Sequence, residues 1–385
     1  MYNVKTFNAI SQDGLDKFSD KYQINQSDNP DAYLIRSSNM LDADFPENLK
    51  VIVRAGAGFN NLPIDRLSEL GIAAFNTPGS NANAVKEVVL SMIIASVRHL
   101  FPVANFSANN LHADISKMKK LDPRFKGTEI RDKTLAVIGL GHVGSLVANA
   151  ANDLGMDVVG YDPYLSSDAA WRIESDITRA TTLEDAIKDA DIITVHVPKN
   201  DETADLIDEK AIKQMKPSVS ILNYARLGIV NNQAVVDALD AGQVASYITD
   251  FGDDVLMNRE DVVITPHIGG STVEAEGNGA VRGAKIIQRY LETGNLSQSL
   301  NLPNMNVSMH SPYRITLIHK NIPNMVGQIA TKAAENNFNI NQMSNGAKGE
   351  MAYTMVDFCD EPTDQLLNDL KSINEVIRIR VIKRK

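Results

Sequence analysis

The feature that most constrains the fold is the stretch from Lys133 to Pro163, KTLAVIGLGHVGSLVANAANDLGMDVVGYDP. It predicts an apolar strand, a glycine-rich turn, a helix and a second apolar strand. Further apolar runs follow as ADIITVHVP, SVSILNYAR, VASYITDF and DVVITPH. Strands that alternate with helices favour a parallel sheet covered on both faces. We therefore expect a doubly wound α/β domain around this stretch.

Its turn has the pattern G-x-G-x-x-G, formed by Gly139, Gly141 and Gly144. In this setting the first glycine permits the tight turn, the second lets backbone approach a pyrophosphate, and the third lets helix and strand pack closely. Asp162 follows Gly144 by 18 residues, at the end of the next strand. An acid there can bind ribose hydroxyls and would repel a 2′-phosphate. The pattern predicts NAD rather than NADP; a glycine turn without a ligand is the alternative.

Three titratable or cationic side chains follow the strands after this turn. His196 precedes a proline in HVP, Arg226 stands in NYARLG, and His267 stands in TPHIGG. Ligands of open α/β sheets bind at the carboxyl ends of strands. There an arginine can clamp a carboxylate, and a histidine can take a hydroxyl proton. Taken singly, each could be a structural or surface residue, so the prediction depends on the joint arrangement.

The rest of the chain predicts two further regions. Residues 1–80 alternate short apolar runs with turns, which indicates a second parallel sheet, and Asn83–Leu100 predicts a buried helix. Ser271 and Glu274 have the spacing of a capping box, so a helix should begin just after Gly270. The polar stretch 296–314 has the composition of a linker. The residues after it follow a βαββαβ order, which is typical of a ferredoxin-like domain.

Composition limits the classes of partner. The formal net charge is −10, the pI is about 5.2, and Cys359 is the single cysteine. No broad basic stripe is present, so nucleic acid is an unexpected partner. No run approaches the ~18 apolar residues of a membrane span, and the N-terminus lacks the pattern of a signal peptide. We expect a cytoplasmic protein that acts on a small molecule and has no membrane partner and no metal.

The motifs GLGHVG, YDP, HVP, NYARLG and TPHIGGST, in this order, together with RAGAGFNNL, NTPGSNANAVKE and the βαββαβ tail, resemble the D-isomer-specific 2-hydroxyacid dehydrogenases with a C-terminal ACT regulatory domain. The resemblance implies an NAD-dependent, homo-oligomeric oxidoreductase. Within the family, the best match implies oxidation of 3-phosphoglycerate to 3-phosphohydroxypyruvate, the first step of L-serine biosynthesis. Another D-2-hydroxyacid substrate and a non-catalytic NAD(H)-sensing protein remain alternatives.

The resemblance also implies domain limits. The substrate-binding domain would comprise residues 1–82 and 271–305, the NAD-binding Rossmann domain residues 83–270, and the ACT domain residues 311–385. The fold would then be two Rossmann-like doubly wound domains plus a ferredoxin-like α+β domain.

The roles of single residues follow from the same resemblance. Arg226 would orient the substrate and His267 would be the acid/base. The cofactor would contact Gly139, Gly141, His142, Val143, Gly144, Asp162, His196, Val197, Pro198, Tyr224, Ala225, Asp250, Gly269 and Gly270. The substrate would contact Arg36, Arg54, Ala57, Gly58 and Asn81, with Arg36 and Arg54 as candidates for its phosphate. A serine effector would contact His319, Asn321 and Asn339.

Two departures from the family pattern are visible. The family has a glutamate shortly after the position of Asp250, where it orients the histidine, but this chain has no glutamate before Glu260. We expect Asp254 to take that role, with Asp253 or a solvated acidic loop as alternatives. In the tail, Asn324 replaces the usual glycine, so a domain used only for oligomerisation is the alternative to a serine site.

Overall fold

The structure is a computed structural model that describes residues 1–110 and 123–384, in which the chain forms two compact units. The split unit joins Met1–Ser80 to Glu276–Lys385, and the central unit comprises Asn81–Ala275. The expected boundaries after residues 82 and 270 lie close to these limits. The C-terminal residues form a sheet of their own and belong to the split unit.

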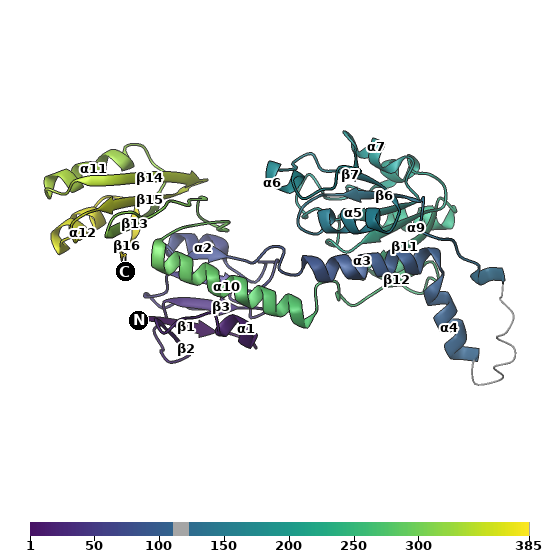
Figure 1. Ribbon diagram of the computed structural model, residues 1–385, viewed down its shortest axis with the longest axis horizontal. Coiled ribbons are helices and arrows are strands. Elements are labelled where there is room, and N and C mark those ends of the chain that lie inside the picture. The colour runs from purple at the N-terminus through teal and green to yellow at the C-terminus, as the bar shows by residue number, and fades with distance from the viewer. Residues whose placement is uncertain (111–122, 385) are drawn as a thin grey trace. The chain divides into compact units, whose positions relative to one another are not determined.

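The central unit is built on a seven-stranded parallel sheet with the order β12-β11-β10-β9-β6-β7-β8. Helices α3 and α5 cover one face, and α7, α8 and α9 cover the other (Figure 1). Along β6, Leu135 and Val137 face the first helix layer, while Ala136 and Ile138 face the second. This alternation is what a strand buried on both faces requires, and it confirms the doubly wound architecture.

The strands of the central unit are β6 (Thr134–Ile138), β7 (Asp157–Tyr161), β8 (Thr178–Arg179), β9 (Ile192–Val195), β10 (Val219–Asn223), β11 (Val244–Thr249) and β12 (Val262–Ile264). Its helices are α3 (Ala82–Val97), α4 (Leu100–Asn110), η2 (Pro123–Phe125), α5 (Gly144–Asp153), α6 (Ser167–Ala170), α7 (Leu183–Ile187), α8 (Glu209–Lys213), α9 (Asn232–Asp240) and η3 (Asp254–Leu256). In the described ranges no helix is by itself long and apolar enough to cross a membrane; only the bent pair α3 and α4 meets the criterion, when both are counted together.

The split unit contains a five-stranded parallel sheet with the order β2-β1-β3-β4-β5. Helix α2 packs on one face through Leu67, and α10 packs on the other through Ile287 and Leu291. The elements are β1 (Tyr2–Thr6), α1 (Gln12–Leu15), β2 (Tyr22–Ile24), β3 (Ala32–Ile35), β4 (Val51–Arg54), α2 (Ile64–Glu69), β5 (Ala73–Phe75) and α10 (Val273–Thr293). The second parallel sheet expected from residues 1–80 is therefore confirmed.

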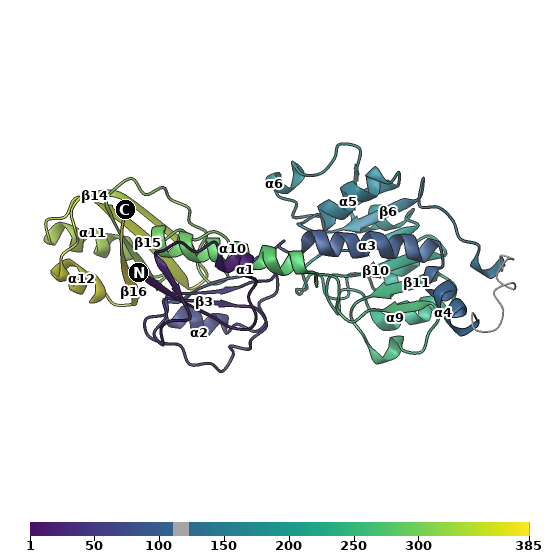
Figure 2. The same cartoon turned by 60° about the horizontal axis from the view of Figure 1, so that its bottom comes forward.

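The end of the chain forms a four-stranded antiparallel sheet with the order β14-β15-β13-β16. Helices α11 and α12 lie together on one face of it (Figure 2). The elements are β13 (Tyr313–Lys320), α11 (Met325–Glu335), β14 (Ile340–Lys348), β15 (Met351–Phe358), α12 (Asp364–Lys371) and β16 (Val376–Lys383). This is the βαββαβ order expected from the sequence, and it confirms the ferredoxin-like plan.

Two local predictions were wrong. Helix α10 begins at Val273, and its capping hydroxyl belongs to Thr272, whose Oγ1 accepts a hydrogen bond from Ala275 N at 3.1 Å. The capping residue therefore lies one position after the predicted Ser271. Both hydroxyl residues precede the helix, but it is Thr272 that stands directly before its first residue and accepts the bond.

The expected linker is instead an ordered part of the split unit. Buried Asn301 donates to Ile72 O at 2.8 Å and accepts from Ala74 N at 2.9 Å, so it pairs with the edge of β5. Leu296 and Met305 are buried and exchange backbone hydrogen bonds. The polar residues of this stretch satisfy buried backbone groups, which is why composition alone suggested a solvated segment.

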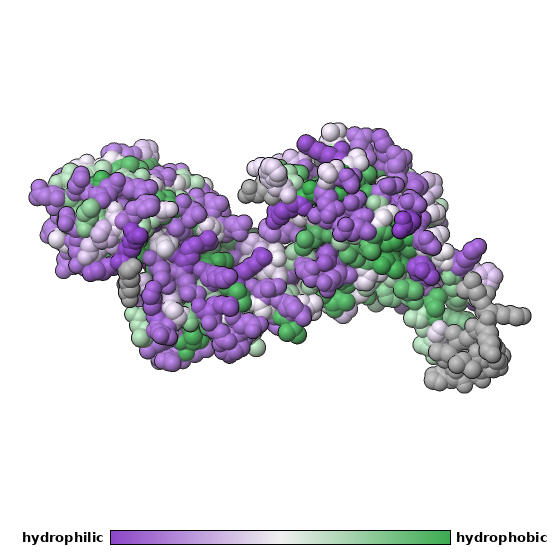
Figure 3. Space-filling model, viewed as in Figure 1, coloured by the Kyte–Doolittle hydropathy of each residue, from purple (hydrophilic) through white to green (hydrophobic). Residues whose placement is uncertain are grey.

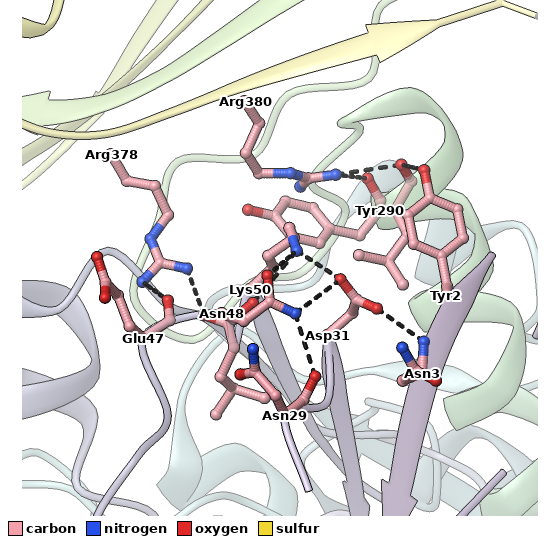
Figure 4. Close-up of polar contacts among 12 residues, drawn as sticks. Tyr2, Asn3, Asn29, Asp31, Glu47, Asn48, Lys50, Tyr290, Arg378 and Arg380 are labelled. Atoms are coloured by element: carbon pink, nitrogen blue, oxygen red, sulfur yellow. Dashed lines mark hydrogen bonds and ion pairs between the residues drawn. The ribbon is translucent and has the colours of Figure 1, made fainter. Parts of the chain in front are cut away.

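The inner face of the antiparallel sheet is held to the rest of the split unit by two arginines of β16, half-buried Arg378 and buried Arg380 (Figure 4). Arg378 donates to the backbone carbonyls of Leu49, Glu47 and Leu70. Arg380 donates to Leu291 O at 3.1 Å and stacks over the ring of Tyr290 at 4.4 Å. These contacts explain why the C-terminal sheet and the N-terminal sheet form one compact unit.

Candidate active site

The glycine turn of the central unit joins β6 to α5. Gly139 has a φ of +92°, and a Cβ on it would lie 2.9 Å from His196 O. A Cβ on Gly144 would lie 1.8 Å from Gly139 O, so neither position accepts a side chain. A Cβ on Gly141 would meet nothing within 4 Å. The first and third glycines therefore permit close packing, and the second leaves open space at the turn, as a bound pyrophosphate would need.

Helix α5 starts directly at this open turn. Its first residues follow His142 and Val143, and its N-terminal N–H groups offer donors and a positive dipole end to an anion. Ser145 Oγ turns back to Gly141 O at 2.7 Å. The turn and the helix start together form a cradle for a diphosphate.

Asp162 lies just after β7 and reaches the same turn. Its Oδ2 accepts a hydrogen bond from Leu140 N at 2.9 Å, and its Oδ1 accepts from Tyr164 N at 2.9 Å. An ionised carboxylate can accept about four hydrogen bonds, so acceptor capacity remains for ribose hydroxyls. Among the residues of this unit, Asp162 and the glycine turn together fit an NAD molecule.

His196 follows β9 and packs behind the turn rather than serving as an acid or base. Its Nε2 lies 3.0 Å from Thr194 Oγ1. Burial lowers the pKa of His196 to about 3, so the ring is neutral at neutral pH. The next residues, Val197 and Pro198, line the strand end, and a Cβ on Gly139 would lie 2.8 Å from Val197 Cγ1. This segment shapes the cofactor site.

Arg226 stands in a turn after β10 that a buried amide fixes. Asn223 Nδ2 donates to Arg226 O at 2.9 Å, and Ala225 N donates to Asn223 Oδ1 at 3.1 Å. Buried Tyr224 places its hydroxyl 3.2 Å from Thr265 Oγ1, which ties this turn to the one after β12. The Arg226 side chain is exposed, and its Nη1 donates to Ala225 O at 2.7 Å. The remaining guanidinium donors can bind a carboxylate.

His267 stands after β12 in an unusual backbone conformation. Its φ is +45°, a region that non-glycine residues seldom adopt, and its N donates to Thr265 O at 3.0 Å. The exposed ring packs against Phe251, with centroids 5.0 Å apart. Such strain occurs disproportionately at functional sites. The structure thus holds the imidazole outward at the carboxyl end of the sheet.

Asp250 directly follows β11. The pKa of its carboxyl group responds to charges on both of these turns. It is 4% exposed, and its Oδ2 accepts from Gly269 N at 3.3 Å. Burial raises the pKa of Asp250, while the positive charges of His267 and Arg226 act to lower it. Its Oδ1 is buried and has no hydrogen-bond partner in the described part of the chain. Asp250 thus lies within electrostatic range of both His267 and Arg226.

The structure does not place Asp254 where the sequence led us to expect it. Asp254 is exposed at the start of η3, and no hydrogen bond or ion pair joins it to His267, both being described residues. Asp253 accepts from Asn232 Nδ2 at 2.9 Å and caps η3. The Asp250 carboxyl group, which the sequence assigned to the cofactor, lies within electrostatic range of His267. Sequence spacing did not single it out for the histidine, because it lies 17 residues before His267 on a neighbouring strand.

Four expected substrate residues lie at the carboxyl ends of β3 and β4 in the split unit. Arg54 Nε donates to Arg36 O at 3.0 Å, and a Cβ on Gly58 would lie 2.1 Å from Arg54 Nη1. Ala57 O accepts from Asn76 Nδ2 at 2.6 Å. The Arg36 guanidinium, however, forms an ion pair with Glu276 at 2.5 Å. The fifth residue, Asn81, begins the central unit.

Asn81 caps the start of α3 next to the glycines that follow His267. A Cβ on Gly270 would lie 2.3 Å from Asn81 Nδ2, and a Cβ on Gly269 would lie 3.0 Å from Asp250 Oδ2. Both glycines therefore allow close approach within the central unit. The approach packs the His267 turn against α3 and Asp250.

The expected effector residues do not share one environment. His319 is 1% exposed, and its ring nitrogens lie 2.8 Å from Lys320 O and from Thr354 Oγ1. Asn321 Nδ2 donates to Gly349 O at 3.3 Å. Asn339 is exposed before β14. In this chain His319 is thus engaged inside the sheet, which leaves Asn321 and Asn339 accessible at its ends.

Comparison with known proteins gives the class of this site. Residues 90–269 match the family model described as D-isomer specific 2-hydroxyacid dehydrogenase, NAD binding domain. The matched range contains the glycine turn, Asp162, Arg226, Asp250 and His267. The match indicates that this part of the chain is an NAD-binding domain, similar to the one that the family model describes.

Curated relatives and solved structures extend the match. The chain is 34% identical to D-3-phosphoglycerate dehydrogenase of Synechocystis sp. over 310 residues, which cover 78% of this chain and 54% of the relative. It is 32% identical to the Bacillus subtilis enzyme of the same name, covering 79% and 60%. It thus spans about half the length of the curated relatives it matches. NAD+-bound 3-phosphoglycerate dehydrogenase of Entamoeba histolytica superposes with a TM-score of 0.60 at 24% identity, covering 78% and 98%.

Proposed function

We propose that the chain is an NAD-dependent D-2-hydroxyacid dehydrogenase that oxidises 3-phosphoglycerate to 3-phosphohydroxypyruvate, at the start of serine biosynthesis in the cytoplasm. One observation carries the proposal. Arg226, Asp250 and His267 stand at the carboxyl ends of β10, β11 and β12, on the sheet that also carries the glycine turn. The 3-phosphoglycerate dehydrogenases among the relatives support the choice of substrate.

In the proposed mechanism the chain positions the acid and moves one proton. Arg226 clamps the substrate carboxylate through its free donors and turns the C2 hydroxyl toward His267. The imidazole takes the hydroxyl proton as the C2 hydride leaves. The glycine turn and Asp162 would hold NAD, which would supply the acceptor for that hydride. The Asp250 carboxylate stabilises the imidazolium electrostatically, and the reverse proton transfer applies to reduction.

The substrate phosphate would bind Arg54 and backbone donors of Ala57 and Gly58. A glycine-rich turn presents N–H groups to anions. In this proposal residues 1–82 and 271–305 bind the substrate, and residues 83–270 bind NAD. Residues 311–385 serve regulation or assembly. Serine binding at Asn321 and Asn339 in a homo-oligomer is part of this proposal.

An unphosphorylated D-2-hydroxyacid is the second candidate. The observation that favours it is the ion pair of Arg36 with Glu276, because it engages one of the two cations expected to hold a phosphate. Removal of that partner in Glu276→Gln would then raise the preference for the phosphorylated acid.

The test is NADH formation with 3-phosphoglycerate, D-lactate and D-glycerate in parallel, and NADH consumption with phosphohydroxypyruvate. We expect turnover of the phosphorylated pair, lost in His267→Ala. A preference for D-lactate or D-glycerate would keep the mechanism and replace the substrate. Tight NAD binding without turnover of any acid would contradict the catalytic proposal and favour an NAD(H)-sensing protein.

A further inference from the structure

The split unit contains a positively charged hollow that the proposed reaction does not use. It has a volume of about 260 Å³ and lies between α10 and the loop after β5. Three cations of α10 line it, namely Arg282, Lys285 and Arg289, together with Ser297 and Gln298 from the segment after the helix. No Asp or Glu is among its lining residues.

The spacing of the cations places them on one side of the helix. Positions i, i+3 and i+7 share a face of an α-helix, and a rise of ~1.5 Å per residue spreads them over about 10 Å. The opposite face of α10 is buried through Ile287 and Leu291. In Figure 3 the side of the molecule over α10 is mostly hydrophilic. The three charges therefore point toward a common space.

These charges are not compensated by neighbouring acids. Within the described ranges, no ion pair involves Arg282, Lys285 or Arg289, although the chain carries a net charge of −10. The nearby carboxylates of the same helix are engaged elsewhere, since Glu276 pairs with Arg36 and Glu292 pairs with Lys21. Three like charges on adjacent turns repel one another, so an anion between them would relieve that repulsion.

The walls of the hollow are fixed by hydrogen bonds. Arg282 Nη1 donates to Pro78 O at 2.8 Å, which holds the guanidinium in place and leaves its other donors for a ligand. Gln298 has a φ of +60°, and its N donates to Asn304 Oδ1 at 2.6 Å. A site whose donors are already held loses less entropy when it binds.

We propose that this hollow binds a small polyanion with two or more phosphate or carboxylate groups. Two anionic groups can bridge cations spread over about 10 Å, whereas a single phosphate contacts only part of the row. The volume fits a compact metabolite, and the short row of charges is too limited for nucleic acid.

The hollow is also linked to the glycine loop at the end of β4. Thr77 Oγ1 accepts from Gly56 N at 2.7 Å, and Thr77 N donates to Gly56 O at 3.0 Å. Thr77 and Pro78 line the hollow, so a bound polyanion would stiffen the loop that contains Ala57 and Gly58. A regulatory effect on substrate binding would rest on the proposed function, but polyanion binding itself does not.

The test is titration calorimetry of the full chain without NAD or substrate, with pyrophosphate, citrate and inorganic phosphate at constant ionic strength. Arg282→Gln/Arg289→Gln removes two cations of the hollow. Lys210→Gln/Lys371→Gln removes two exposed lysines elsewhere and is the matched control for charge. We expect pyrophosphate or citrate to bind the natural protein, with affinity falling about 100-fold in the first variant, roughly tenfold per lost contact, and staying unchanged in the second.

Several outcomes would overturn the proposal. They are an absence of binding, an equal loss in both variants, and binding that survives Arg282→Gln/Arg289→Gln because it occurs at the glycine turn or another site. A preference for pyrophosphate over citrate would identify a phosphate ligand, and the reverse a carboxylate ligand, each in support. Turnover is measured separately, so failure of the catalytic proposal leaves this result readable.

Discussion

The carboxyl end of the central unit's sheet and the inner face of the C-terminal sheet both hold charged side chains, but they satisfy them to different degrees. On the C-terminal sheet, Arg314 is fully buried and uses all five of its N–H donors, two of them on Asp357 at 2.6 and 2.9 Å. Among the described residues of the central unit, Asp250 keeps a buried oxygen without a hydrogen-bond partner, and the Arg226 guanidinium donates only to Ala225 O.

This difference distinguishes charged side chains that stabilise the fold from charged side chains that keep capacity to bind a ligand. A saturated buried pair leaves nothing for a substrate to bind, and removing one partner strands the other charge. Around His267, by contrast, the buried carboxyl of Asp250 and the strained backbone of His267 are energetically unfavourable. In the proposed function, substrate binding would relieve part of that cost. The following predictions test whether the two regions divide in this way.

The largest effect is expected from His267→Ala. Loss of the proton acceptor should lower kcat by about 10²- to 10⁴-fold, the usual contribution of general acid–base catalysis. Because the ring is exposed, the melting temperature should stay close to that of the natural protein. Steady-state rates and a melting curve measure both. His310→Ala, an exposed histidine in the split unit, is the control and should keep full activity.

Arg314→Met should instead cause a large loss of stability. Stranding buried Asp357 should cost about 3–5 kcal/mol of unfolding free energy. Arg314→Met/Asp357→Leu removes both charges and should recover much of that loss, which denaturant titration can establish. If the single variant were as stable as the natural protein, the pair would not hold the sheet and the comparison would fail.

Asp250→Asn should separate stability from activity. Burial raises the folded-state pKa of Asp250, so the native state binds more protons than the unfolded state between the ordinary carboxyl pKa and the raised one. Stability should therefore fall as pH rises through that window, and the asparagine variant should lose this dependence. Denaturant titrations across the window test the sign.

The same variant should lower kcat/KM by about tenfold or more, because the imidazolium of His267 loses its negative neighbour. Asp254→Asn is the matched control, since no hydrogen bond or ion pair joins Asp254 to His267, both being described residues. A larger loss in Asp254→Asn than in Asp250→Asn would restore the original assignment of the histidine's partner.

Asp162→Ala should have the smallest effect, confined to the cofactor. Loss of ribose hydrogen bonds should weaken NAD binding by about tenfold, roughly 1–1.5 kcal/mol, and reduce the discrimination against NADP. Fluorescence titration with NADH and NADPH measures both. An unchanged affinity for NADH would remove Asp162 from the cofactor site.

The sequence by itself determined the features that depend on local periodicity and spacing. The strand–glycine–helix pattern of Lys133–Pro163 predicted the NAD-binding fold, and the structure leaves no room for a Cβ at Gly139 or Gly144. The alternation of apolar runs likewise determined the second parallel sheet, and the βαββαβ order determined the C-terminal sheet.

Only the tertiary structure decided which distant groups meet. It brought Asp250 into the electrostatic range of His267, paired Arg36 with Glu276, and buried Arg314 against Asp357. It also turned a polar stretch into an ordered layer through Asn301. Such contacts join residues of different elements, whose approach is determined by the packing of whole sheets and helices and leaves no mark on local sequence pattern.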